Sequence, residues 1–351
     1  MIAGASLPSA LSANILLALA AAASWGGGDF SGGMGVKAAG GSTSSALRVV
    51  ILAHASSLAV LLAILFLHHP SFPPLLHRAP LVWGLVAGVT AGIALTAFYI
   101  ALARGAMGAS AAVSGLLAAA IPAAVSSVLE GVPSPLRLAG FALALAAIWL
   151  IAAGPSPEST QAIDGSAPSA ANRSTMTLAI IGGLGFGIYF VGLRLANPLG
   201  IIAPVALARA GSLTTCALLL LALTIRTRAK NKGAASSTNS GATSSTNPDA
   251  PSSTNPGAPS SPAALPSAKV GVRLTRAILL WALGVALLDT GGNLLFIAAT
   301  RSGRLDIAAV LASLYPAGTI LLAAWHLHER PTRRQLTGMA IATAAVVMIT
   351  L

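Results

Sequence analysis

The sequence has little charge and a single cysteine. Only 8% of its 351 residues are charged, and eight acidic residues stand against twenty Lys and Arg. A soluble protein of this length needs more charge to cover its surface, so the composition excludes an ordinary soluble globular protein. The lone Cys216 excludes a disulfide or a cysteine-ligated metal site within one chain.

What the sequence has instead is long apolar runs. Hydrophobic residues make up 55% of the chain and the mean hydropathy is +0.83. A helix that spans a bilayer needs about 20 mostly apolar residues. Ten segments meet that need, which predicts an all-α integral membrane protein of the cell (cytoplasmic) membrane. They are 11–34, 45–67, 81–103, 107–129, 135–154, 175–196, 201–225, 277–300, 305–327 and 333–351.

Two low-complexity segments divide the chain. Residues 155–174 separate the fifth span from the sixth, and so separate a first five-helix repeat, 1–154, from a second, 175–351. Residues 230–268 repeat Ser, Thr, Asn, Pro and Gly with almost no aliphatic residues, which predicts a disordered loop inside the second repeat. The N-terminus lacks a basic region of the signal-peptide type, so its first apolar run is expected to be a retained helix.

The two halves resemble each other in sequence. At an offset of 197 residues, Ile100, Ala101 and Arg104 align with Ile297, Ala298 and Arg301. Five spans in each half is an odd number, so the second half is expected to cross the membrane in the opposite direction. Inverted repeats of this kind are typical of secondary transporters, whose substrate site lies between the repeats near the bilayer midplane.

Small residues and prolines predict where the helices pack and bend. Gly84, Gly88 and Gly92 form one stripe on the third span, where another helix can approach closely. Three prolines lie inside apolar runs, where each removes a backbone hydrogen bond and is expected to kink or break its helix: Pro122, Pro204 and Pro316.

Two segments carry a family resemblance. One runs from Leu314-Tyr315-Pro316-Ala317 through His326-Leu327-His328-Glu329-Arg330-Pro331-Thr332 to Gln335-Leu336-Thr337-Gly338; the other is Ser24-Trp25-Gly26. With ten spans and two repeats, the chain resembles an EamA-type transporter of the drug/metabolite transporter (DMT) superfamily. The first half departs from the family pattern, with Glu130-Gly131 in place of Glu-Arg.

The resemblance implies ten helices around a central cavity and movement of small metabolites by alternating access. The expected function is secondary transport of a small organic metabolite, amino-acid-like or similar, in the direction of efflux. Proton or sodium is the candidate coupling ion, the partners are membrane lipid and a small-molecule substrate, and the chain is a monomer or a homodimer. The alternatives are a multidrug or lipid-precursor carrier and, from another class, an integral-membrane enzyme or a sensory or assembly subunit.

Two carboxylates in apolar spans are the leading site candidates. Asp29 follows Trp25 and three glycines, and Asp289 precedes Thr290, two glycines and Asn293. A carboxylate in hydrocarbon is costly, so it normally faces a cavity or a partner and marks a pathway. The alternatives are an interfacial position for Asp29 and a polar helix–helix contact for Asp289. Both are expected to line the cavity, with Trp25 and Tyr315 or Asn293 nearby.

Arg48 and Arg209 hold matching places in the two halves. They either balance the charges of these carboxylates or extend to the lipid headgroups.

Three further charged residues lie at helix ends. Glu130, Glu329 and Arg330 are expected to cap helices rather than to take part in transport. His326 and His328 lie two residues apart and do not share a helix face, which disfavours a metal site, and no cofactor is expected.

The distribution of Lys and Arg leaves the orientation open. Most lie in loops on the side opposite the N-terminus, so the positive-inside rule places both termini outside, whereas the family resemblance implies both inside. The same confinement to short loops disfavours a nucleic-acid partner. No metalloprotease or phosphate-binding loop motif is present, so the sequence predicts no enzyme.

Overall fold

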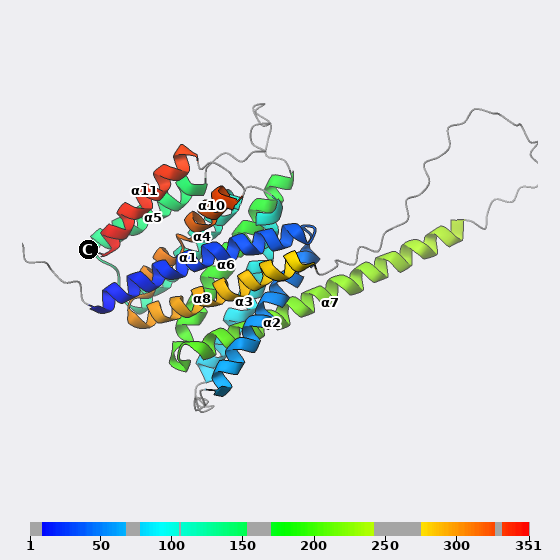
Figure 1. The fold of residues 1–351 in the computed structure, drawn as a ribbon, viewed down its shortest axis with the longest axis horizontal. Coiled ribbons are helices and arrows are strands. Elements are labelled where there is room, and N and C mark those ends of the chain that lie inside the picture. The colour runs from blue at the N-terminus through cyan, green and yellow to red at the C-terminus, as the bar shows by residue number, and fades with distance from the viewer. Residues whose placement is uncertain are drawn as a thin grey trace, which may run out of the picture.

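The computed structural model describes residues 9–67, 78–104, 107–152, 170–241, 275–326 and 332–350, and every regular element in these ranges is helical. In chain order the elements are α1 (Ser9–Ala38), α2 (Thr43–Leu67), α3 (Arg78–Arg104), α4 (Met107–Leu129), α5 (Pro135–Ala152), α6 (Ala170–Leu195), the short 3-10 helix η2 (Asn197–Leu199), α7 (Ile202–Gly241), α8 (Arg276–Ser302), α9 (Leu305–Ala312), α10 (Tyr315–His326) and α11 (Arg333–Thr350). Figure 1 shows them as one bundle, from which the end of α7 projects.

The helices follow the predicted spans, with one of them broken. The expected ninth span is two helices, α9 and α10. If this pair counts as one, the described part of the chain holds ten α-helical segments besides the short η2. Within the described residues six segments are long and apolar enough to cross a membrane, namely Thr43–Leu67, Arg78–Arg104, Arg173–Leu195, Ile202–Ala229, Arg276–Ser302 and Leu305–His326. Shorter apolar helices lie at Val113–Leu129 and Pro135–Leu150. The prediction of a multi-pass α-helical membrane protein is therefore confirmed, and that of ten full spans only in part.

The three prolines behave differently from one another. Pro316 is the second residue of α10, directly after the break at Ser313–Leu314, as predicted for a helix breaker. Pro122 lies inside a continuous α4. Pro204 lies in the first turn of α7, which begins at Ile202, so no helical backbone hydrogen bond is lost there. The kink expected at this proline stays a prediction.

Among the described helices α1 and α8 make the most extensive contact with each other, and they run antiparallel. Asn14 donates to the carbonyl of Ala299 over 2.8 Å, and Ser24 donates to that of Leu288 over 2.8 Å. Gly28 is close enough to α8 that an added Cβ would lie 3.2 Å from the backbone nitrogen of Asp289. The glycines before Asp29 thus allow α1 to bring its carboxylate beside that of α8.

The predicted glycine stripe of α3 is where α7 packs. An added Cβ on Gly88 would lie 2.3 Å from the carbonyl oxygen of Ala208. Gly84 faces Leu207 and Gly92 faces Ser212 in the same way. Only glycine permits this approach, so the prediction of close helix packing along the stripe is confirmed.

The two halves pack on each other through equivalent helices. The third helix of each half packs on the first helix of the other half: α3 packs on α6, and α8 packs on α1. The second helices, α2 and α7, contact each other, and so do the last, α5 and α11, which Figure 1 shows side by side at one edge.

The predicted disordered loop is shorter than expected at its start. The helix α7 continues to Gly241, so residues 230–241 are helical rather than irregular. The rest of the segment, and the predicted caps Glu329 and Arg330, lie outside the described residues.

Candidate functional site

Arg209 and Asp289 form a buried ion pair between α7 and α8. Nη2 of Arg209 lies 2.6 Å from Oδ2 of Asp289, and the two residues are 1% and 8% exposed. Nη2 also donates to the hydroxyl of Thr290 over 3.2 Å. A buried charge without a partner is strongly destabilising, so each of these residues needs the other.

His54 of α2 completes this cluster and has a defined tautomer. Nη1 of Arg209 donates to its Nε2 over 2.7 Å, so Nε2 carries the lone pair. The proton then lies on Nδ1, which donates to the hydroxyl of Ser212 over 2.8 Å. His54 is thus a neutral link between the α7 and α8 residues, and Nε2 lies 3.6 Å from the Asp289 carboxylate.

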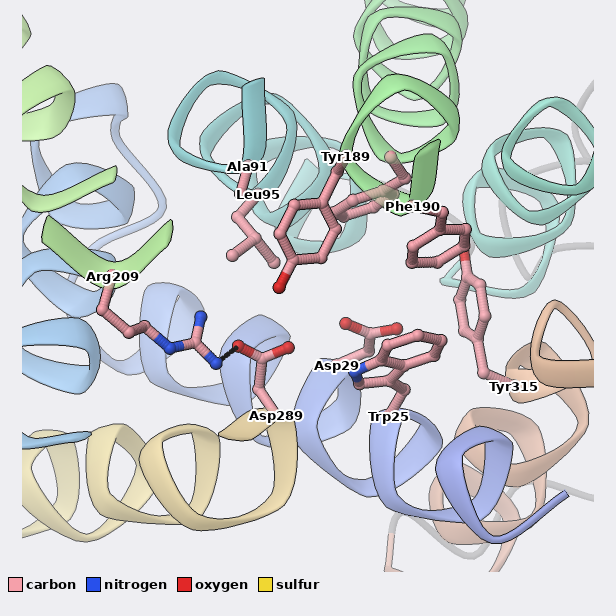
Figure 2. Close-up of a pocket in the computed structure, with 10 residues that line it drawn as sticks. Trp25, Asp29, Ala91, Leu95, Tyr189, Phe190, Arg209, Asp289 and Tyr315 are labelled. Carbon is pink, nitrogen blue, oxygen red and sulfur yellow. Dashed lines mark ion pairs between the residues drawn. The ribbon is translucent and has the colours of Figure 1, made fainter. Parts of the chain in front are cut away.

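A pocket of about 370 Å³, including the part open to solvent, lies against this cluster. Helices of both halves line it (Figure 2): Trp25, Asp29, Ala91, Leu95, Phe186, Tyr189, Phe190, Arg209, Asp289 and Tyr315. Asp289 is the middle residue of α8, which places the pocket midway along that helix. Two carboxylates, one guanidinium and five aromatic side chains therefore meet halfway through the bundle.

The pocket wall is largely aromatic. Trp25 stacks on Phe190 with ring centroids 4.9 Å apart and planes at 10°, and Phe190 contacts Phe296 at 4.8 Å. These rings come from α1, α6 and α8, so the stack ties the two halves together. Tyr315 lies on α10, directly after the break in the ninth span, and its hydroxyl donates to the carbonyl of Ala111 over 3.3 Å.

A second polar cluster lies at the end of the bundle that holds the start of α9. Oε2 of Glu130 accepts hydrogen bonds from Ser126 at 2.7 Å and from the backbone N–H of Leu305 at 2.9 Å, while Oε1 pairs with Arg194 at 3.0 Å. Arg304 donates to the carbonyl oxygens of Glu130 and Gly131. The predicted role of Glu130 as a helix cap is confirmed, and the helix that it caps is α9 of the other half.

This environment shifts two pKa values. Partial burial alone would raise the pKa of Glu130, but the hydrogen bonds from Ser126, Leu305 and Arg194 outweigh it and lower the pKa below its usual value. Hydrogen bonds to the carboxylate of Asp306 raise the pKa of Arg304. Asp306 is fully buried, and its Oδ2 lies 2.8 Å from Nη2 of Arg304.

The predicted site residues fall into two groups. Trp25, Asp29, Arg209, Asp289 and Tyr315 all line the pocket. The other two, Arg48 and Asn293, do not. Arg48 is half-buried. Asn293 is fully buried one turn after Asp289, and no described residue hydrogen-bonds to its side-chain amide. The roles of all seven remain predictions.

Sequence reasoning missed four residues of this region. His54 was detectable, because an ionisable residue inside an apolar span is itself a site signal. Tyr189 is one of three tyrosines and follows a glycine-rich stretch of α6, which is a weaker signal. Phe186 and Phe190 give no sequence signal of a site, since an aromatic residue in a membrane helix usually serves only in packing.

The described residues hold no group of three or more His, Cys, Asp or Glu that could bind a metal ion. His326 instead makes edge-to-face contacts with Phe30 and Trp281 at ring distances of 5.7 Å. The other members of the His-x-His-Glu pattern, His328 and Glu329, lie outside the described residues.

Comparison with known proteins finds a match to a transporter family over the last part of the chain. Residues 258–351 match the model of the EamA-like transporter family. This match confirms the family resemblance where its most specific motif lies, and together with the apolar helices it supports a membrane transporter. The EamA-like segment contains α8 to α11 and therefore Asp289 and Tyr315 of the pocket.

The fold has a counterpart among solved structures. A chain titled "Crystal structure of protein" matches with a TM-score of 0.62 and 14% sequence identity, over 96% of each chain. At this identity the likeness concerns the fold alone. It extends over almost the whole chain, beyond the segment that matches the EamA-like family. A search of curated proteins returns no match.

Proposed function

We propose that this protein is a secondary transporter of a small organic metabolite, which it moves across the cytoplasmic membrane by alternating access, in the direction of efflux. The observation that carries the proposal is the pocket itself. It lies midway along α8, it is lined by helices of both halves, and it contains ionisable groups that a merely structural core would avoid.

The reciprocal packing supports two inverted repeats as the moving parts. Each half supplies the equivalent helices to the other, and α1 and α8 run antiparallel. Contacts of Glu130 with Arg194 and Leu305 join the halves at one end of the bundle. In alternating access such contacts form in one state and break in the other, so this cluster is the proposed gate at that end.

Asp29 is the proposed coupling residue, with a proton as the coupling ion. Unlike Asp289, it pairs with no arginine in the described part of the chain, so it can exchange a proton for a cationic group of the substrate. A site that binds either a proton or the substrate, but not both at once, couples the flux of protons to the flux of substrate. Substrate would then leave the cell as a proton enters.

Reconstitution tests this proposal. The purified full-length protein is placed in liposomes and offered a broad panel of labelled metabolites under a proton gradient and, separately, under a sodium gradient. Gradient-driven movement of at least one solute, reduced in Asp29→Asn, is the expected result. Protein that moves nothing under either gradient would refute transport, and movement driven by sodium alone would refute proton coupling.

A further inference from the structure

Asp29 is an unpaired carboxylate inside the pocket. Its side chain is almost fully buried, and no residue that the structure describes gives it a hydrogen bond or an ion pair. The positive charge of Arg209 is already balanced by Asp289 at 2.6 Å. With all three groups ionised, the pocket therefore has a net charge of one negative unit, located at Asp29.

An aromatic surface lies next to this carboxylate. Trp25 precedes Asp29 by one helical turn on α1, so the indole and the carboxylate share a helix face. Phe190 stacks on the indole with ring centroids 4.9 Å apart, and Tyr315 lies beside it in Figure 2. A cation within reach of such ring faces is attracted to them, most strongly by Trp.

Tyr189 supplies a polar group with no partner. Its hydroxyl is buried and makes no hydrogen bond with any described residue. Figure 2 shows the hydroxyl of Tyr189 and the carboxylate of Asp29 pointing toward the same space in the pocket. A buried hydroxyl left unpaired is costly, so a ligand that hydrogen-bonds to it gains affinity.

We propose that the pocket binds a compact organic cation, an amine or quaternary ammonium compound that carries a hydroxyl or similar polar group and no carboxylate. Asp29 pairs with the cationic centre, Trp25 and its neighbouring rings surround it, and Tyr189 binds the polar group. This inference rests on the proposed transport function and restricts the class of substrate to organic cations.

The same charges disfavour an amino-acid zwitterion. Its carboxylate would enter a pocket with two carboxylates and one guanidinium, and that guanidinium is already engaged by Asp289, His54 and Thr290. Like charges in a poorly solvated site repel strongly. A ligand with a positive charge and no negative one avoids this conflict.

Three small probes of nearly equal size separate these possibilities. Choline has a trimethylammonium group and a hydroxyl. Its carbon isostere, in which tert-butyl replaces trimethylammonium, has the same shape without charge. Glycine betaine keeps the trimethylammonium group and adds a carboxylate. Binding of radiolabelled choline to the full-length purified protein is measured by scintillation proximity, with the other two as competitors.

The expected result is saturable choline binding, with the isostere and glycine betaine each weaker by roughly tenfold or more. Asp29→Asn should abolish choline binding while Asp29→Glu, which keeps the charge, retains part of it. Trp25→Leu should weaken choline binding roughly threefold to thirtyfold. The matched control Trp149→Leu, on an exposed face of α5, should bind choline like the wild type.

Any of three outcomes would overturn the proposal. The first is equal competition by choline and its uncharged isostere, and the second is stronger competition by glycine betaine than by choline. The third is no choline binding by wild-type protein that is folded, as judged by its cooperative thermal unfolding. None of them refutes transport, because the liposome panel tests that separately with solutes of every charge.

Discussion

The guanidinium of Arg209 on α7 lies 2.6 Å from the carboxylate of Asp289 on α8, and both residues are buried. Asp29, the other carboxylate of the pocket, has no such partner among the described residues. The two aspartates therefore belong to different classes, although the sequence presents them alike, each beside glycines in an apolar span. Asp289 holds α7 against α8, and Asp29 is left available to a ligand.

Removing one partner of this ion pair should destabilise the protein strongly. Arg209→Gln leaves Asp289 as an uncompensated buried charge, and a loss of about 3–5 kcal/mol is expected. The double variant Arg209→Gln/Asp289→Asn should lose less than the sum of the two single variants, because neither charge then remains alone. Thermal unfolding of the purified variants measures this. Additive losses would mean that the two side chains do not interact.

Neutralising the two aspartates should have different effects. Asp29→Asn should keep the melting temperature of the wild type within error while reducing transport and its pH dependence, since no residue that the structure describes pairs with this carboxylate. Asp289→Asn should lower the melting temperature, since it leaves Arg209 buried without its counterion. Transport by Asp29→Asn at the wild-type rate at every pH would rule out its role in coupling.

A methyl group at Gly88 should disrupt the contact between α3 and α7. The new Cβ would lie 2.3 Å from the carbonyl oxygen of Ala208, and backbone cannot give way as a flexible side chain can. We expect Gly88→Ala to cost about 1–3 kcal/mol. Gly291→Ala is the matched control, because its Cβ would meet only the Ser24 hydroxyl at 3.4 Å. Equal melting temperatures of the two variants would contradict the close packing.

The sequence predicts the helices well because an apolar run long enough to span the bilayer has few alternatives to a helix. It also predicts that another helix packs on the glycine stripe of α3, since glycines four residues apart lie on one helix face and leave room there for a close neighbour. It does not predict that Arg209 pairs with Asp289 whereas Arg48 stays out of the pocket, because both arginines occupy equivalent positions in their spans. That choice depends on how the two halves pack, and so do the positions of His54 and Tyr189.

Glu130 provides a test of stability against pH at the end of the bundle. Because its pKa is lowered in the folded protein, the ionised side chain contributes stability that is fully present above the unfolded glutamate pKa of about 4.3 and is lost as the pH falls through the lower folded value. Glu130→Gln removes this contribution at every pH. At neutral pH the variant should therefore unfold at a lower temperature than the wild type.

The difference between Glu130→Gln and the wild type should shrink as the pH falls below about 4, because the wild-type carboxyl is then neutral as well. A partly exposed ion pair contributes about 0.2–1 kcal/mol, so the shift in melting temperature at neutral pH is expected to be modest. Thermal unfolding followed from pH 7 to acidic pH gives the comparison. If the difference stayed constant over this range, the ionised form of Glu130 would not be what joins α9 to α4 and α6. The capping of α9 would then depend on the shape of the side chain rather than its charge, and the proposed gate would not respond to acid.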